Sequence, residues 1–129
     1  MQPAGQFPDE NSADGEFARQ EDAFRDWVRR DGSTPYAPEP GRYHLYVSLA
    51  CPWAHRTLIA RRLRRLETVI GVTVLDPVRD ERGWAFRAGD GFSHDPVNGF
   101  QFLREAYLAS DPGFRGRWTV PGLWDKRTK

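Results

Sequence analysis

The sequence predicts a single α/β domain built around a strand–helix–strand unit. Three observations carry this prediction: an alternating run of apolar residues before Cys51, a helical pattern that starts at Pro52, and a second apolar run that ends at Leu75. Strand, helix and strand at this spacing form a βαβ unit, in which the two strands are parallel. We therefore expect a small, partly parallel sheet at the centre of the chain.

The composition is that of a globular domain with a real core. The 129 residues suggest one domain, and 39% of them are hydrophobic and 13% aromatic. The formal net charge of +1 indicates neither an acidic nor a basic partner. Because Cys51 is the single cysteine, an intramolecular disulfide and a cysteine-built metal cage are excluded, and a reducing compartment is expected.

No targeting or membrane signal is visible. Residues 1–10 contain neither a basic region nor an apolar run, and no stretch approaches the roughly 20 apolar residues that span a bilayer. We expect a soluble, cytoplasmic protein with no membrane partner.

Residues 1–40 are expected to form an N-terminal extension or linker, and residues 41–129 the domain itself. A short helix is predicted over residues 16–30. Its apolar side would consist of Phe17, Ala23, Phe24, Trp27 and Val28. The prolines at positions 35, 38 and 40 forbid a helix, so residues 34–40 are predicted to be extended.

The βαβ unit is predicted element by element. Residues 42–49 alternate apolar and polar side chains as a strand does, and residues 69–75 are almost continuously apolar, as in a strand covered on both faces. A helix is predicted from Pro52 to about Leu66, because proline is well tolerated at the first helical position. The apolar side of this helix is predicted to be Leu58, Ile59, Leu63 and Leu66, and its water-facing side Arg56, Arg61, Arg62, Arg64 and Arg65.

The second half of the chain is less regular. Residues 76–97 are too long for an ordinary connection and are predicted to be either functional or loosely ordered. A helix follows over residues 98–108, with Asn98 as its N-cap. Its buried side is expected to be Phe100, Leu103, Tyr107 and Leu108. Residues 117–125 form a last extended segment, and an exposed apolar third strand suggests a chain that stops before a hairpin partner.

Cys51 is the residue best placed for chemistry. It follows a strand and immediately precedes a helix opened by Pro52, so free N–H groups and the positive end of the helix dipole are expected beside its sulfur. Such an environment lowers a thiol pKa from about 8.5 toward neutrality, and His55 and Arg56 would add positive potential. The alternative is a small buried cysteine without reactivity, a common fate of this residue type.

Several segments, taken in order, resemble one family. Residues 48–56 read Ser-Leu-Ala-Cys-Pro-Trp-Ala-His-Arg and are similar to the cysteine motif of glutathionyl-hydroquinone reductases, the Xi class of glutathione transferases. The further matching segments are residues 41–46, 80–86, 104–108 and 117–126. A Cys-Pro-aromatic turn alone is weakly specific, because glutaredoxins and omega-type transferases also contain one. The segments together, from about residue 5 to residue 129, are strongly specific.

The resemblance implies a thioredoxin-like glutathione-binding domain followed, in the family, by an all-helical domain. It also implies a reaction, the reductive removal of glutathione from a glutathionyl-hydroquinone through a cysteine–glutathione mixed disulfide. Glutathione would be the co-substrate and would resolve the mixed disulfide, so one cysteine suffices. Full-length members pair as homodimers.

The resemblance also assigns roles to residues of this chain. Cys51 would be the nucleophile, supported by Pro52, His55 and Arg56, and Trp84 the aromatic wall of the glutathione pocket. The strip that pairs with the glutathione backbone would consist of Arg117, Trp118, Thr119 and Val120, followed by Pro121. The Val120–Pro121 bond would be cis, which exposes the preceding N–H and C=O groups so that they can bind a peptide like an added strand.

Plainer interpretations stand beside these roles. Trp84 would otherwise simply cover an apolar patch, and Trp118 and Trp124 are expected in the core or at an interface. His44 is expected to be a strand residue with a satisfied hydrogen bond, and His94 to have no role. The arginines of residues 56–65 are a solvated face rather than a nucleic-acid site, since no known module accompanies them and the net charge is small.

In the family, the segment at Pro121 is followed by another strand and a Glu-Ser pair that binds glutathione, and then by the helical domain with the hydroquinone pocket. These features are not found before residue 129, so the resemblance implies weak or absent reductase activity for this chain alone. Two alternatives stay open. One is an omega-like thiol transferase or dehydroascorbate reductase, and the other is a non-catalytic thioredoxin-fold fragment or interaction module.

Overall fold

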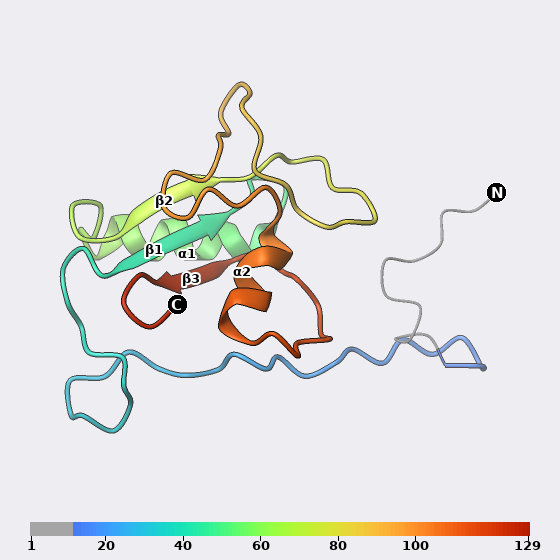
Figure 1. The fold of residues 1–129 in the computed structure, drawn as a ribbon, viewed down its shortest axis with the longest axis horizontal. Helices are drawn as coiled ribbons and strands as arrows, with labels where there is room; N and C mark the ends of the chain where they lie inside the picture. The colour runs from blue at the N-terminus through green and yellow to red at the C-terminus, as the bar shows by residue number, and fades with distance from the viewer. Residues whose placement is uncertain (1–11) are drawn as a thin grey trace.

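A computed structural model describes residues 12–129, and within them a three-stranded sheet and two helices form the fold (Figure 1). The elements are β1 (Tyr43–Val47), α1 (Pro52–Leu63), β2 (Gly71–Val74), α2 (Leu103–Ser110) and β3 (Gly122–Asp125). The strand order is β2-β1-β3, with β1 parallel to β2 and antiparallel to β3. The predicted βαβ unit and its parallel pair are confirmed, and the expectation for residues 1–10 lies outside the described part of the chain.

The central strand β1 is covered on both faces. All five of its residues are buried, including His44, whose Nε2 lies 2.7 Å from the Oγ1 atom of Thr73 on β2. Burial lowers the pKa of His44, so its ring is a neutral hydrogen-bonding group within the sheet. The apolar–polar alternation predicted a strand correctly. Both faces of this strand are buried, so the alternation does not separate a buried face from a solvent-exposed one.

Helix α1 begins at the predicted proline and ends earlier than predicted. Its C-cap is Arg64, and Arg65 adopts a positive φ of 54°, which stops the helix three residues before Leu66. The predicted apolar side is wrong in part, because Ile59 and Leu63 are exposed. Arg61, predicted to face water, instead folds back and donates hydrogen bonds to the carbonyl oxygens of Ile70 (2.7 Å) and Glu67 (3.1 Å).

The long connection between β2 and α2 is ordered around buried aromatic residues. Trp84, Ala85 and Phe86 are at most 6% exposed, and Trp84 and Phe86 belong to the core that also contains Leu45 and Leu103. The backbone of Ala85 forms an isolated bridge with Phe102, which fixes the connection against the start of α2. A loosely ordered loop, one of the two predicted outcomes, is therefore excluded.

Helix α2 begins five residues later than predicted because a polar turn precedes it. The Asp95 carboxylate accepts hydrogen bonds from the backbone N–H groups of Val97, Asn98 and Phe100, which keeps these residues out of a helix. Asn98 is therefore not the N-cap, and its side chain donates to the hydroxyl of Tyr46 instead.

A side chain from the first turn of α2 stabilises the start of this helix. The Glu105 carboxylate accepts hydrogen bonds of 2.7 Å from the N–H groups of Gln101 and Phe102, and its negative charge suits a helix N-terminus. Leu103 and Ala106 form the buried side. Tyr107 is half-buried, and Leu108, predicted to be buried, is 38% exposed because it points away from this side.

The predicted helix over residues 16–30 does not form. These residues run extended along one side of the domain, past β3 and α2 (Figure 1). Phe17, Trp27 and Phe24 are 61%, 68% and 48% exposed, so no common apolar face is buried. A short helix gains most of its stability from burying such a face, and without that burial an extended chain is preferred.

A buried ion pair joins the neighbouring strands β1 and β3 at one end of the sheet. Arg42 donates to both carboxylate oxygens of Asp125, at 2.9 and 2.7 Å, and both side chains are at most 8% exposed. Arg42 also donates to the carbonyl oxygen of Pro35, while Tyr43 Oη donates to that of Ala37. The pair therefore holds β1, β3 and residues 35–37 together.

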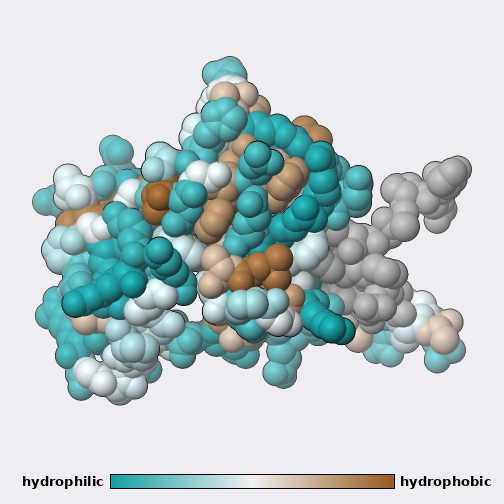
Figure 2. Space-filling view, in the orientation of Figure 1, coloured by the Kyte–Doolittle hydropathy of each residue, from teal (hydrophilic) through white to brown (hydrophobic). Residues whose placement is uncertain are grey.

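The surface in the same view is mostly hydrophilic, with small and separate hydrophobic patches (Figure 2). Among the described residues, no helix has the length and apolar character needed to cross a bilayer.

Candidate thiol site

The candidate site is built on the junction between β1 and α1. Cys51 is the N-cap residue of α1, has extended backbone angles and is half-buried, and Pro52 occupies the first helical turn. The backbone N–H groups of this first turn have no partner within the helix, and the positive end of the helix dipole lies at the same place. The thiol therefore has both access to solvent and a favourable position for negative charge, as the sequence predicted.

A second element reaches the same sulfur from far away in the sequence. The Val120–Pro121 peptide bond is cis, as the resemblance implied. The Cys51 Sγ atom lies 3.5 Å from the carbonyl oxygen of Val120, to which the protonated thiol donates a hydrogen bond. The cysteine and the residue that precedes the cis proline therefore form one site.

The backbone next to this contact is already partly occupied. The hydroxyl of Tyr107 on α2 donates to the carbonyl oxygen of Thr119 at 2.7 Å and accepts from the N–H group of Thr119 at 3.3 Å. Among the described residues, no acceptor is found for the N–H group of Val120. In residues 119–120, the backbone groups of Val120 are therefore those left to face the thiol and any ligand.

A cavity of about 620 Å³ opens along this strip. Its walls include Thr119, Val120 and Pro121 on one side, Trp53 from α1, and residues 19–27 of the N-terminal segment (residues 12–40). A cavity of this size falls within the range that holds small-molecule ligands. Cys51 is not among the lining residues, and the cavity meets the thiol site through Val120, whose carbonyl oxygen contacts the sulfur. The N-terminal segment, which the sequence did not predict to take part, borders the site in this way.

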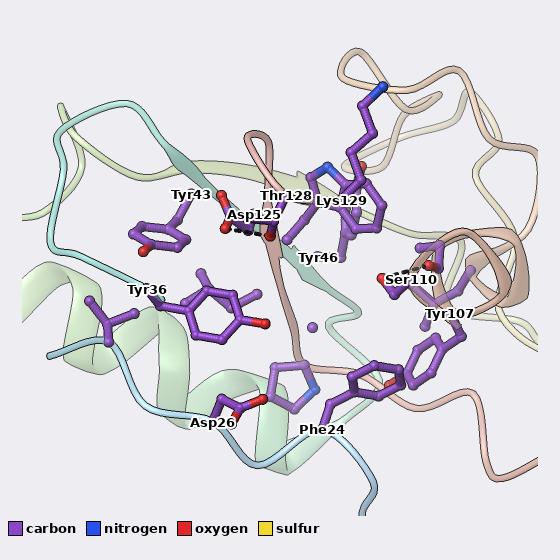
Figure 3. A pocket seen from close by; sticks show the side chains of 17 residues that line it. Phe24, Asp26, Tyr36, Tyr43, Tyr46, Tyr107, Ser110, Asp125, Thr128 and Lys129 are labelled. Carbon is purple, nitrogen blue, oxygen red and sulfur yellow. Dashed lines mark hydrogen bonds between the residues drawn. The ribbon is translucent and has the colours of Figure 1, made fainter. Parts of the chain in front are cut away.

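A neighbouring cavity of about 320 Å³ lies against the face of β3 (Figure 3). Phe24 and Tyr107 line both cavities, and their rings are in edge contact with centroids 5.5 Å apart. Figure 3 shows Phe24 extending from the N-terminal segment toward Tyr107 on α2. The two side chains therefore stand between the two cavities.

The remaining predicted site residues are less closely joined to the sulfur. His55 and Arg56 are exposed on the first turns of α1, and the guanidinium of Arg56 lies over the ring of Trp53, 4.6 Å from its centroid. Trp84 is buried in the core, with Arg79 over its ring. Trp84 does not line the cavity along residues 119–121.

The other members of the strip differ in how they are placed. Arg117 and Thr119 line the cavity, whereas Trp118 does not. Trp118 is half-buried, and its indole Nε1 is buried without a hydrogen-bond partner among the described residues.

Phe24, Trp53 and Tyr107 border the site although the sequence did not predict them there. Phe24 and Tyr107 each carried an apolar-periodicity signal, which indicated burial but did not indicate a cavity wall. Trp53 had a usable signal, because it stands two residues after Cys51 in the quoted motif.

No family model matches the chain. Glutathionyl-hydroquinone reductase YqjG of Escherichia coli K12 is 47% identical over 126 residues, which cover 92% of this chain and 38% of that protein. Glutathionyl-hydroquinone reductase PcpF of Sphingobium chlorophenolicum is 44% identical over 121 residues, covering 94% and 37%. A Schizosaccharomyces pombe protein named glutathione S-transferase omega-like 2 is 45% identical, covering 92% and 38%. The chain thus spans less than two-fifths of the length of these relatives.

Solved structures agree with the sequence comparisons. The Xi glutathione transferase of Phanerochaete chrysosporium superposes with a TM-score of 0.81 at 48% identity, covering 87% of this chain and 38% of that one. The glutathione-bound structure of Escherichia coli YqjG superposes with a TM-score of 0.77 at 49% identity, covering 81% and 36%.

The fold and the site are those of a thioredoxin-like domain with a cysteine at a helix start. More narrowly, the chain is similar in sequence to part of the glutathionyl-hydroquinone reductases, and in fold to part of the Xi-class glutathione transferases.

Proposed function

We propose that Cys51 takes glutathione from a glutathionyl-hydroquinone and carries it as a mixed disulfide. The observation that carries the proposal is the 3.5 Å contact between Cys51 Sγ, at the start of α1, and the carbonyl oxygen of Val120, before the cis proline. The glutathionyl-hydroquinone reductases of Escherichia coli and Sphingobium support the substrate class by their similarity.

The chemistry balances with glutathione as the single co-reactant. The Cys51 thiolate attacks the sulfur of the glutathionyl group, the carbon–sulfur bond to the ring breaks, and the ring carbon takes up a proton to give the hydroquinone. A second glutathione then attacks the mixed disulfide, which releases glutathione disulfide and restores the Cys51 thiolate. The substrate is reduced by two electrons, and two glutathione thiol equivalents are oxidised to one disulfide.

Each part of the site has a role in this proposal. The start of α1 stabilises the thiolate, and His55 and Arg56 add positive potential. The N–H and C=O groups of Val120 pair with the peptide backbone of glutathione as an added strand would. Arg117 and Thr119 line the cavity that receives the ligand, whereas Trp84 belongs to the hydrophobic core against which Cys51 packs.

The first experiment asks whether Cys51 exchanges with glutathione. The chain is incubated with glutathione disulfide, and intact-mass spectrometry follows the addition of one glutathione, which dithiothreitol should reverse. Cys51→Ser should lose the addition completely and keep the fold, because serine is nearly isosteric. Failure of the unsubstituted chain to form the adduct, while iodoacetamide still alkylates Cys51, would overturn the proposal.

The substrate class needs a second assay. Glutathionyl-hydroquinone is supplied with glutathione, and release of the hydroquinone is followed by chromatography. The expected result is Cys51-dependent release in a single turnover with the adduct as the other product. An adduct that forms from glutathione disulfide but never from the thioether would reject hydroquinone reduction and retain thiol exchange.

A second candidate function is an omega-like thiol transferase, which the name of the Schizosaccharomyces pombe relative favours. The same two assays separate the candidates, because a thiol transferase acts on disulfides and not on the thioether. Cytoplasmic location, homodimer formation, and the division into an extension over residues 1–40 and a domain over residues 41–129 also belong to this proposal. Size-exclusion chromatography with light scattering tests the dimer.

A further inference from the structure

We propose that Tyr107 is a positioning residue that holds the backbone of Thr119 and Val120 in register for a bound thiol peptide, and that Phe24 clamps Tyr107 in place. This inference rests on the proposed function, since it names what prepares the same site. It assigns a role to a helix side chain and to the N-terminal segment, both distant in sequence from Cys51.

The first step is the double hydrogen bond of the Tyr107 hydroxyl. It donates to Thr119 O at 2.7 Å and accepts from Thr119 N at 3.3 Å, so one side-chain atom satisfies both backbone groups of one residue. A peptide that approached the strip would compete with Tyr107 for the N–H group of Thr119 and for one of the two lone pairs of its carbonyl oxygen. The ligand is therefore directed to Val120, the residue whose carbonyl oxygen lies 3.5 Å from the Cys51 sulfur.

The second step is the packing that fixes the Tyr107 ring. Phe24 meets it edge-on with centroids 5.5 Å apart, and Phe114 packs against it with centroids 5.0 Å apart. Phe24 and Phe114 are themselves 5.4 Å apart, so the three rings form a closed cluster. Such contacts favour one ring orientation, and that orientation brings the hydroxyl to Thr119.

The third step is the place of this cluster in the cavity walls. Phe24, Tyr107 and Phe114 all line the cavity of about 620 Å³ together with Thr119 and Val120. Phe24 is 48% exposed and therefore contributes little to the core, so its ring contacts with Tyr107 and Phe114 are the packing role that the structure gives it. Loss of Phe24 should loosen the site and leave the sheet unchanged.

Tyr107→Phe tests the hydroxyl, because it keeps the ring cluster and removes both bonds to Thr119. We expect the rate of adduct formation with glutathione disulfide to fall about fivefold, the effect of losing one net hydrogen bond. Alkylation of Cys51 by iodoacetamide should stay within about twofold of the unsubstituted rate, because a small reagent needs no backbone pairing. A purely structural role would change both rates together or neither.

Phe24→Ala tests the clamp, and Phe17→Ala is its matched control. Phe17 is also on the N-terminal segment, is 61% exposed and does not line either cavity. Phe24→Ala should slow reaction with glutathione disulfide selectively, Phe24→Tyr should restore it by keeping the ring, and Phe17→Ala should have no effect.

The outcomes separate this inference from the proposed function. If the unsubstituted chain forms no glutathione adduct, the proposed function fails and this inference fails with it. If the adduct forms normally and Tyr107→Phe and Phe24→Ala both react at the unsubstituted rate, the positioning role alone is overturned. Equal slowing with both reagents also overturns it, since that pattern indicates a general loss of structure.

Discussion

Two regions of this domain satisfy their polar groups in different ways. One is the sheet framework, which consists of β1, β2, β3 and the side chains buried against them, and the other is the thiol face, which consists of Cys51, Trp53 and residues 119–121. In the framework, Arg42 and Asp125 are paired within the structure, and the Tyr46 hydroxyl donates to Asp95. At the thiol face, Cys51 is half-buried and Trp53 is 57% exposed. The charged groups and the Tyr46 hydroxyl of the framework have their partners within the structure, whereas the thiol face keeps groups that a ligand can use.

Stability and chemistry therefore depend largely on different residues in this domain. Buried and fully paired polar groups are costly to disturb, while half-exposed side chains contribute little to the free energy of unfolding. Substitutions in the framework should therefore lower the free energy of unfolding, and substitutions at the thiol face should change reactivity. Paired substitutions in the two regions can test this separation.

The largest loss of stability is expected from Asp125→Asn. The substitution removes the negative charge that Arg42 contacts at 2.7 Å inside the protein, and a buried charge left without its partner costs about 3 kcal/mol. Urea unfolding followed by circular dichroism measures the change. Glu39→Gln is the control, because Glu39 is 41% exposed and its contact with Arg42 should contribute less than about 1 kcal/mol. Equal losses for both variants would contradict the comparison.

Tyr46→Phe is expected to cost about 1–2 kcal/mol, because it removes a buried donor from the Asp95 carboxylate at 2.9 Å and an acceptor from Asn98. Tyr46 is 1% exposed, so water cannot replace the lost bonds. Tyr36→Phe serves as the matched control, since Tyr36 is only partly buried, and should change stability by less than about 0.5 kcal/mol. A similar loss in both variants would place the effect outside the buried network.

Acid should weaken the framework through Asp125. The hydrogen bonds from Arg42, followed by those from Thr128 and the Arg127 backbone, hold the pKa of the Asp125 carboxyl well below its usual range. The stabilisation is complete above the unfolded pKa of about 4 and is lost as the pH falls toward the folded value, because the unfolded chain then binds more protons. The free energy of unfolding should be lower at about pH 3 than at about pH 6, and the difference should be smaller in Asp125→Asn. If the free energy of unfolding of Asp125→Asn depended on pH as strongly as that of the unsubstituted chain, other carboxyl groups would be responsible for the acid sensitivity.

The smallest change in stability is expected from Trp53→Ala at the thiol face. Trp53 is 57% exposed, and its main contact is the guanidinium of Arg56 over its ring, so the free energy of unfolding should change by less than about 0.5 kcal/mol. Because Trp53 lines the cavity, the rate of adduct formation with glutathione disulfide should fall in the same variant. A large loss of stability without a change in the rate of adduct formation would show that Trp53 contributes to stability rather than to reactivity.

Local patterns in the sequence predicted the elements near Cys51 better than those farther away. The strand before Cys51 and the helix start at Pro52 were predicted correctly because their signals are local: alternation in one case and proline at the first helical position in the other. The helix expected over residues 16–30 was wrong because Phe17 and Trp27 stay exposed while Phe24 packs against other rings, so the apolar residues share no buried face. The start of α2 was wrong because the Asp95 side chain captured three backbone N–H groups that the pattern alone assigns to a helix.

By itself, the sequence determined the parallel strand–helix–strand unit, the place of Cys51 at a helix start, and the resemblance that pointed to Pro121. The tertiary structure decided which backbone group meets the thiol, since Cys51 and Val120 are 69 residues apart, and it decided that Tyr107 and Phe24 border the site. The physical reason is that hydrogen bonds and periodicity within a few residues specify a helix or a strand. Contacts between distant segments depend instead on how the whole core packs.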